Sequence, residues 1–198
     1  MNEKQVIISI GREFGSGGHA IAEKIAENRN LPLYDYNMLQ SIADEKEVNV
    51  NTFEKYDEIP KIPFMSRTVR GFSNSPEENL AQMQFDFLRK KAESGESFVV
   101  VGRCSEMVLK EFDCMVPIFV QGDMETKIER IMRVREVSRD KAVSMIKSHD
   151  KMRKAYHNYY CTVKWGDSRN YEMCINSSKI GLDETVQIIE AYIDKRFK

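Results

Sequence analysis

Residues 11–19 read Gly-Arg-Glu-Phe-Gly-Ser-Gly-Gly-His and lie between a short apolar run, residues 5–10, and a helical pattern, residues 20–27. A buried strand, a glycine-rich loop and a helix start together make a cradle for phosphate. Glycines allow positive φ angles, so several backbone N–H groups and the positive end of the helix dipole can face one anion. A plain tight turn is the alternative interpretation of the same residues.

The loop has the context of a P-loop but lacks its lysine. In that motif the last glycine is followed by Lys, which reaches the β- and γ-phosphates, and then by Ser or Thr, whose hydroxyl reaches Mg²⁺. Gly18 stands in the place of the lysine, and Ala20 stands in the place of the hydroxyl in the spacing that nucleotide kinases use. We expect the anion to be bound by the backbone of Gly15, Ser16, Gly17, Gly18 and His19. The His19 side chain either contacts a phosphate or lies exposed.

Length and charge bound the possible functions. A chain of 198 residues can bury one substantial core, which predicts a single domain, residues 1–198. The net charge is −1 and the pI is about 6.4, so no global attraction to nucleic acid or to an acidic membrane is expected. The apolar run near the N-terminus is too short for a signal sequence or a membrane span. We therefore predict a cytoplasmic protein, and the sequence leaves its oligomeric state open.

The four cysteines, Cys104, Cys114, Cys161 and Cys174, form no CxxC pair and show no ligand spacing with the three histidines. The sequence therefore predicts no disulfide framework, no zinc site and no metal-ligating residues. Buried, reduced thiols are the expected state.

Apolar runs alternate with charged segments of helical periodicity along the whole chain. The runs are residues 5–10, 31–36, 97–101, 116–120 and 171–175. This alternation predicts an α/β fold with a parallel sheet flanked by helices. Helix signals predict helices over residues 76–95, 123–136, 138–156 and 182–196; the first begins with Ser75 as N-cap and Pro76 as its first residue.

Two stretches do not fit a minimal fold of this kind. Residues 49–75 contain two prolines and then Arg67 and Arg70, which is typical of an inserted, less regular segment that contacts substrate. Residues 127–154 are dense in Lys and Arg.

Taken together, these features resemble the cytidylate kinase-like family of P-loop nucleoside monophosphate kinases. The resemblance covers nearly the whole chain and rests jointly on the glycine loop, Gly102-Arg103, residues 150–153, residues 156–160, Trp165-Gly166-Asp167 and residues 174–178. It implies a P-loop NTPase-type, five-stranded parallel sheet, an acceptor-binding insertion at about residues 38–75 and a helical lid at about residues 127–165. It also implies transfer of the ATP γ-phosphoryl group to a nucleoside monophosphate, with CMP as first choice. Mg²⁺ would be held mostly through water and phosphates.

The resemblance also suggests which residues bind the nucleotides. Asn176 and Ser177 match the corner that packs near the adenine. The residues expected to bind the acceptor are Asp35, Arg67, Arg70, Arg103 and Asp150. Asp35 is expected near the acceptor sugar or the metal, and an exposed carboxylate is the alternative. Asp150 is expected to order the lid by pairing with Arg153 three residues later.

Phosphoryl transfer needs in-line positioning and positive charge more than covalent chemistry from the protein. Without a loop lysine, we expect the charge to come from Arg12, Arg103, Arg130, Arg133 and Arg153, because arginine grips phosphate bidentately. For each of them a surface ion pair is the alternative. Arg130 and Arg133 are expected to reach the phosphoryl group only after the lid closes, which would couple donor and acceptor binding. Introducing the missing lysine by Gly18→Lys should then raise ATP affinity if the φ of Gly18 suits a side chain.

Two other functions fit the sequence less well. The first is a module that binds nucleotide or phosphate with little or no turnover, since both the lysine and the hydroxyl are absent. The second is a nucleic-acid-binding protein that uses the basic helices, which the neutral charge balance and the lack of a recognised module disfavour. The aromatic residues Tyr156, Tyr159, Tyr160 and Trp165 either stack on a base or pack in the core.

Overall fold

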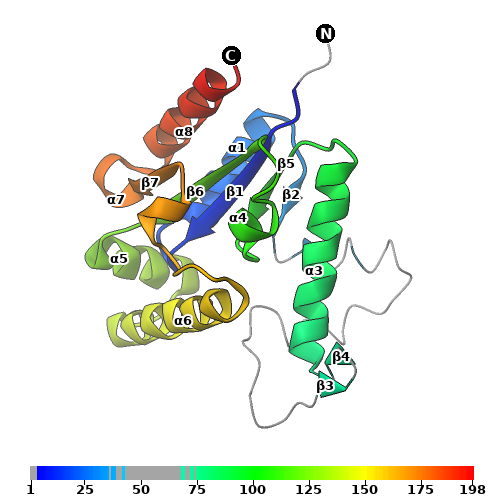
Figure 1. The fold of residues 1–198 in the computed structure, drawn as a ribbon. Coiled ribbons are helices and arrows are strands. Elements are labelled where there is room, and N and C mark those ends of the chain that lie inside the picture. The colour runs from blue at the N-terminus through cyan, green and yellow to red at the C-terminus, as the bar shows by residue number, and fades with distance from the viewer. Residues whose placement is uncertain (1–3, 36, 39–41, 43–67, 70–71, 74) are drawn as a thin grey trace.

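The computed structural model describes the chain except residues 1–3, 36, 39–41, 43–67, 70–71 and 74 (Figure 1). Its elements follow in the order β1 (Ile7–Arg12), α1 (Gly18–Asn28), β2 (Leu33–Tyr34), β3 (Thr68–Val69), β4 (Phe72–Ser73), α3 (Pro76–Glu93), β5 (Phe98–Val101), α4 (Ser105–Val108), β6 (Met115–Gln121), α5 (Met124–Arg135), α6 (Arg139–Tyr160), the 3₁₀ turn η3 (Ser168–Asn170), β7 (Met173–Asn176), α7 (Ser177–Ile180) and α8 (Leu182–Arg196).

The main sheet has five strands in the order β2-β5-β1-β6-β7, all of them parallel. The predicted five-stranded parallel sheet is therefore confirmed. The strand β1 lies at its centre, with Ile7 opposite Phe98 of β5 and Met115 of β6. Because the strands run in the same direction, the segments that follow β1, β2, β5 and β6 all leave the sheet at the carboxyl ends of the strands. The glycine loop therefore lies at the end of the sheet where ligands bind in folds of this class.

Helices cover both faces of the sheet, as Figure 1 shows. Successive side chains of a strand point to opposite faces, so Ile8 and Ile10 of β1 pack against α1 and α8, while Ile7 packs in the cluster that includes α3. The helices α5 and α6 pack on each other through Ile131 and Ile146. These two helices belong to the stretch expected as a lid.

The predicted helix boundaries are close to the observed ones. Ser75 caps α3 by accepting a hydrogen bond from the Glu78 N–H, and Pro76 is the first helical residue. The helix α6 continues to Tyr160, beyond the predicted end at residue 156, because Tyr156 and His157 are still on its buried face. No helix in the described part of the chain is long and apolar enough to cross a bilayer.

Candidate functional site

The glycine loop has the backbone shape that a phosphate cradle requires. Gly15 and Gly17 have φ angles of 85° and 83°, in the left-handed region that residues with a Cβ rarely adopt. Gly17 is the N-cap of α1 and offers no side-chain cap to the first N–H groups of the helix. Two predicted anion donors are engaged within the loop, the Ser16 N–H with Glu13 O and the Gly18 N–H with Ser16 Oγ, both at 3.3 Å. These are long hydrogen bonds that an anion can replace.

A guanidinium from α5 lies directly on this loop. A Cβ at Gly17 would be 1.7 Å from Nη1 of Arg130, which belongs to α5. Nε and Nη1 of Arg130 are buried and have no hydrogen-bond partner among the described residues. Burial lowers the pKa of Arg130, and the neighbouring Arg133 adds to that effect. Buried cationic donors without a partner are costly, and an anion on the loop would satisfy them.

Arg12 explains why the motif's lysine is missing. A Cβ at Gly18 would be 2.5 Å from Cβ of Arg12 and 3.1 Å from its Cγ. The φ of Gly18 is not in the positive range, so space and not backbone conformation excludes a side chain there. The stem of Arg12 fills the volume from which a lysine at position 18 would extend. The structure therefore leaves no room at position 18 for the lysine side chain that was expected to raise ATP affinity in Gly18→Lys.

The helix α6 is docked on the tip of the loop. The Phe14 N–H donates to Oδ1 of Asp150 at 2.6 Å, and the Phe14 ring stacks on His149 with centroids 4.1 Å apart. The buried Nζ of Lys127 binds Oε2 of Glu13 at 3.0 Å and Oδ2 of Asp150 at 3.1 Å. Both oxygens of Asp150 are thus used to hold the loop. Asp150 therefore pairs with Phe14 and Lys127, whereas the sequence predicted a pair with Arg153, and its binding of the acceptor stays a prediction.

A cleft of about 790 Å³ runs along the loop, a size suited to a small-molecule ligand. Of the predicted site residues it brings together Arg12, Gly15, Gly17, Gly18, His19, Asp35, Arg103, Arg130, Arg133 and Arg153. Arg130 lies at the loop in this arrangement of α5 and α6, and its arrival only on closure of a lid stays a prediction. Leu182, which the sequence did not single out, also lines the cleft.

Two predicted residues, Ser177 and Asn176, form hydrogen bonds beside the loop and do not line the cleft. The buried Ser177 hydroxyl donates to the carbonyl oxygen of Ser16 at 2.5 Å. Asn176 donates to Oδ1 of Asp123 at 2.8 Å and accepts from the Ser178 N–H at 3.0 Å. With its side-chain amide used in this way, Asn176 fixes the corner between β7 and α7. Arg67 and Arg70 lie outside the described residues.

A carboxylate and an imidazole pair on the wall of the cleft. Oδ2 of Asp35 lies 2.7 Å from Nε2 of His19, and Oδ1 accepts from the Asn37 N–H at 2.8 Å. Burial raises the pKa of Asp35, but the hydrogen bonds from His19 and Asn37 outweigh it and lower the pKa overall. The hydrogen bond to Asp35 raises the pKa of His19. The residue that directly follows Gly18 thus carries positive charge more readily than a free histidine does.

The aromatic residues at and after the end of α6 mostly pack against other aromatic rings. Tyr160 contacts both Tyr156 and Tyr159, with ring centroids 4.8 Å apart in each case. Trp165 packs edge-on against Phe119 of β6 at 5.4 Å. Core packing therefore accounts for Tyr156, Tyr160 and Trp165, while Tyr159 is 47% exposed.

Known proteins match both the sequence and the fold. Residues 7–179 match the model of the cytidylate kinase-like family. A curated cytidylate kinase from Pyrococcus horikoshii is 25% identical over 196 residues, which cover 98% of this chain and 91% of that protein. A solved structure of an uncharacterized protein from Eubacterium ventriosum is 41% identical with a TM-score of 0.77, covering 96% of this chain and 99% of the other. A shikimate kinase from Bacteroides thetaiotaomicron, 12% identical with a TM-score of 0.56, shares the fold over 96% and 98% of the two chains. With the family model matching most of its length, the chain belongs to the cytidylate kinase-like family.

Proposed function

We propose that this protein is a nucleotide kinase that transfers the γ-phosphoryl group of ATP to a nucleoside monophosphate, with CMP as the first-choice acceptor. Family membership supports a kinase-type phosphotransferase, and the relative named cytidylate kinase supports the choice of CMP. The observation that carries the proposal is the buried guanidinium of Arg130, with its free Nε and Nη1 donors, against the left-handed Gly17.

The donor phosphates would lie on the glycine loop. There the N–H groups at the start of α1 point along the positive end of the helix dipole. Arg12 and Arg130 approach the loop from β1 and α5 and supply the charge that a loop lysine supplies elsewhere. Arg133 and Arg153 line the same cleft and would add positive charge around the phosphates. In this arrangement the protein stabilises the charge on the moving phosphoryl group and holds it in line.

The fit to Mg²⁺ is weaker than the fit to phosphate. Mg²⁺ prefers octahedral oxygen ligands and keeps several waters, but His19 and Ala20 follow Gly18 where the motif has a hydroxyl. Asp35 and Glu23 are carboxylates that line the cleft and contact His19. The ion would therefore be held mainly through phosphates and water, and it would neutralise charge between the phosphates.

The acceptor would lie beside the ends of β2 and β5, which are neighbours in the sheet. Asp35 follows β2 and Arg103 follows β5, and both face the cleft. A carboxylate can orient a sugar hydroxyl, and a guanidinium can grip the monophosphate. Arg103 is only 3% exposed, so little water screens its charge.

An ADP-release assay with ATP, Mg²⁺ and each nucleoside monophosphate in turn tests this function. We expect the largest kcat/KM with CMP. Tight ATP binding without ADP release for any monophosphate would support the binding module instead. Absence of both binding and turnover would reduce the loop to a plain turn.

The Arg103→Ala variant should weaken monophosphate binding by about 1.5–3 kcal/mol, the range for hydrogen bonds to charged groups, and leave ATP binding almost unchanged. The reason is that Arg103 follows β5, which pairs with β2, the strand that precedes Asp35. Calorimetric titration with CMP and with ATP measures both effects, and Arg103→Lys, which keeps the charge but not the fork, should fall between. Equal weakening of both ligands would show that Arg103 has a structural role.

Positions 12 and 18 compete for the same space. Exchanging their residues should therefore separate the effect of Arg12 on ATP binding from the effect of Gly18. Gly18→Lys alone should destabilise the fold by about 1–3 kcal/mol, as overpacking does, because its Cβ meets Cβ of Arg12 at 2.5 Å. Arg12→Gly alone removes a cation and should weaken ATP binding. The double variant Arg12→Gly/Gly18→Lys should bind ATP more tightly than either single variant, measured by titration beside urea unfolding. Additive losses in the double variant would contradict the shared-space argument.

A further inference from the structure

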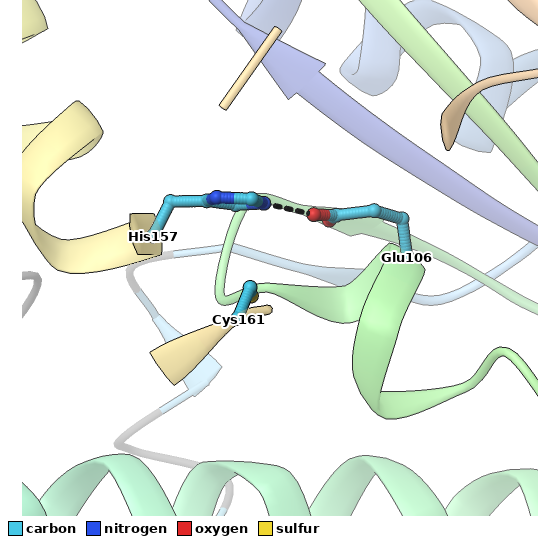
Figure 2. Close-up of side chains that lie close together, drawn as sticks. All are labelled: Glu106, His157 and Cys161. Carbon is cyan, nitrogen blue, oxygen red and sulfur yellow. Dashed lines mark hydrogen bonds and ion pairs between the residues drawn. The ribbon is translucent and has the colours of Figure 1, made fainter. Parts of the chain in front are cut away.

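A second group of polar side chains lies between α4 and the end of α6, and the mechanism above does not use it (Figure 2). Glu106 belongs to α4, His157 to the last turn of α6, and Cys161 follows that helix. Their ligand atoms all lie within 4.8 Å of one another, and Nε2 of His157 is 2.5 Å from Oε1 of Glu106. Cys104, the N-cap of α4, belongs to the packed cluster against which Cys161 lies. Three potential ligands therefore converge from two elements, and Cys104 lies beside them as a fourth candidate.

The cluster is well shielded from water. Cys104, Glu106 and His157 are each at most 5% exposed, and Cys161 is half-buried. Cys104 and Cys161 also pack in an apolar cluster with Tyr156. A carboxylate in such a place is costly unless a cation compensates it. The compensating charge is either a protonated His157 or a metal ion.

We propose that Cys104, Glu106, His157 and Cys161 form a binding site for a divalent, zinc-type metal ion. Two sulfurs, one imidazole nitrogen and one carboxylate oxygen are the donor types that Zn²⁺ prefers, and four protein ligands make a closed, structural site. His157 and Cys161 are four residues apart, so both project from the same face at the end of the helix. This site lies beyond the proposed kinase function and does not depend on it.

The geometry needs only a small adjustment to hold the ion. Ligands at the usual 2.0–2.3 Å from a tetrahedral centre lie about 3.3–3.8 Å from one another. The His157–Glu106 pair would therefore open by about 0.8 Å from its present 2.5 Å. A cavity of about 20 Å³ borders Cys104, Glu106 and His157 but not Cys161, and about 10–15 Å³ already holds one water molecule. Arg12, Arg103 and Arg153 also line this cavity, so the negative charge of the carboxylate and the thiolates has to outweigh theirs for a cation to bind.

A metal here would fix two arginines of the cleft. Arg103 directly precedes Cys104, and Arg153 is one turn before His157 on α6. The site would thus join the loop after β5 to the end of α6. Ligand spacing in the sequence predicts no zinc site because its two halves are about fifty residues apart, and only the fold brings them together. The structure also corrects the expectation of buried thiols, since Cys174 is exposed.

The same residues have a metal-free alternative. Burial lowers the pKa of His157, but its hydrogen bonds with Cys161 and Glu106 outweigh that effect and raise the pKa to about 10. In that state an imidazolium pairs with the Glu106 carboxylate, and the cluster has no metal affinity beyond that of ordinary surface groups. Metal titration distinguishes the two states directly.

The test is a Co²⁺ titration of the full-length protein after treatment with chelator, under reducing conditions. We expect one equivalent of Co²⁺ to bind with a thiolate-to-cobalt charge-transfer band in the near ultraviolet, and Zn²⁺ to displace it. Cys161→Ser changes a single atom and should lose one of the two thiolate contributions to that band. His157→Ala should weaken Co²⁺ binding by about 100-fold, the upper end of what loss of even an outer-shell partner costs. The matched control, Cys174→Ser, should behave as the wild type does.

Three results would overturn the proposal: no charge-transfer band in the wild type, the same band in Cys161→Ser, or equal loss in Cys174→Ser. Far-UV circular dichroism of each variant shows that the fold is retained. Since the readout is spectroscopic, a failed kinase assay leaves the metal result intact, and a failed metal titration leaves the kinase proposal intact.

Discussion

A Gly17→Val variant is expected to lose ATP binding altogether while the sheet stays folded. Gly17 has a φ of 83°, and a side chain in that region costs about 1–2 kcal/mol. Space is the greater obstacle, because a Cβ would lie 1.7 Å from Nη1 of Arg130 and 2.6 Å from Cδ2 of Leu182. Arg130 would have to leave the loop, so the variant loses both the close backbone approach and the guanidinium above it.

Gly95→Val is the matched control for this change. Gly95 has a φ of 81°, and a Cβ there would meet nothing within 4 Å, so the control carries the backbone cost without the contact. ATP affinity is measured by calorimetry, and folding by circular dichroism and urea unfolding. We expect Gly95→Val to lose some stability and keep ATP binding. If Gly17→Val binds ATP as tightly as the wild type does, the glycine loop is not the phosphate-binding site.

The sheet and its helices were predictable from the sequence because their signals are local. Residues 98–101 form an unbroken apolar run, and the strand β5 is buried along its whole length. Ser75 and Pro76 mark a helix start that needs no tertiary contact to form. The end of α6 was harder to predict from the sequence, because Tyr156 and His157 extend the helix through contacts with residues far away in the sequence.

The candidate site was predictable only in part, for the same reason. The glycine loop is local and was found by its spacing. The roles of Lys127 and Asp150 depend on where α5 and α6 pack on the loop, and the bond from Lys127 to Glu13 joins residues 114 positions apart. A basic stretch in a sequence does not show which of its cations is buried. The packing of Arg12 beside Gly18 could not be predicted from the sequence either. The glycine at the place of the motif's lysine was the only sequence feature that pointed to it.

Replacing Arg130 by Ala should lower kcat by about 10³-fold or more, the range measured for an arginine that stabilises the transferred phosphoryl group. Arg130 holds its buried Nε and Nη1 over Gly17, where the proposed function places the charge that develops on the γ-phosphate. Because the guanidinium lies there while α6 is docked, ATP binding should weaken as well. Arg130→Lys should recover only part of the loss, since a lysine lacks the planar fork.

Two further arginines test whether the effect belongs to Arg130 itself. Arg133 is exposed on the same helix and lines the cleft, so Arg133→Ala should cost less than Arg130→Ala. Arg139 is exposed and paired with Glu125 at 2.7 Å, so Arg139→Ala should leave both kcat and ATP affinity unchanged. Steady-state ADP release and ATP titration of the three variants decide the matter. If Arg130→Ala keeps full phosphoryl-transfer activity, the charge that replaces the missing lysine must come from elsewhere in the cleft, with Arg12 the next residue to test.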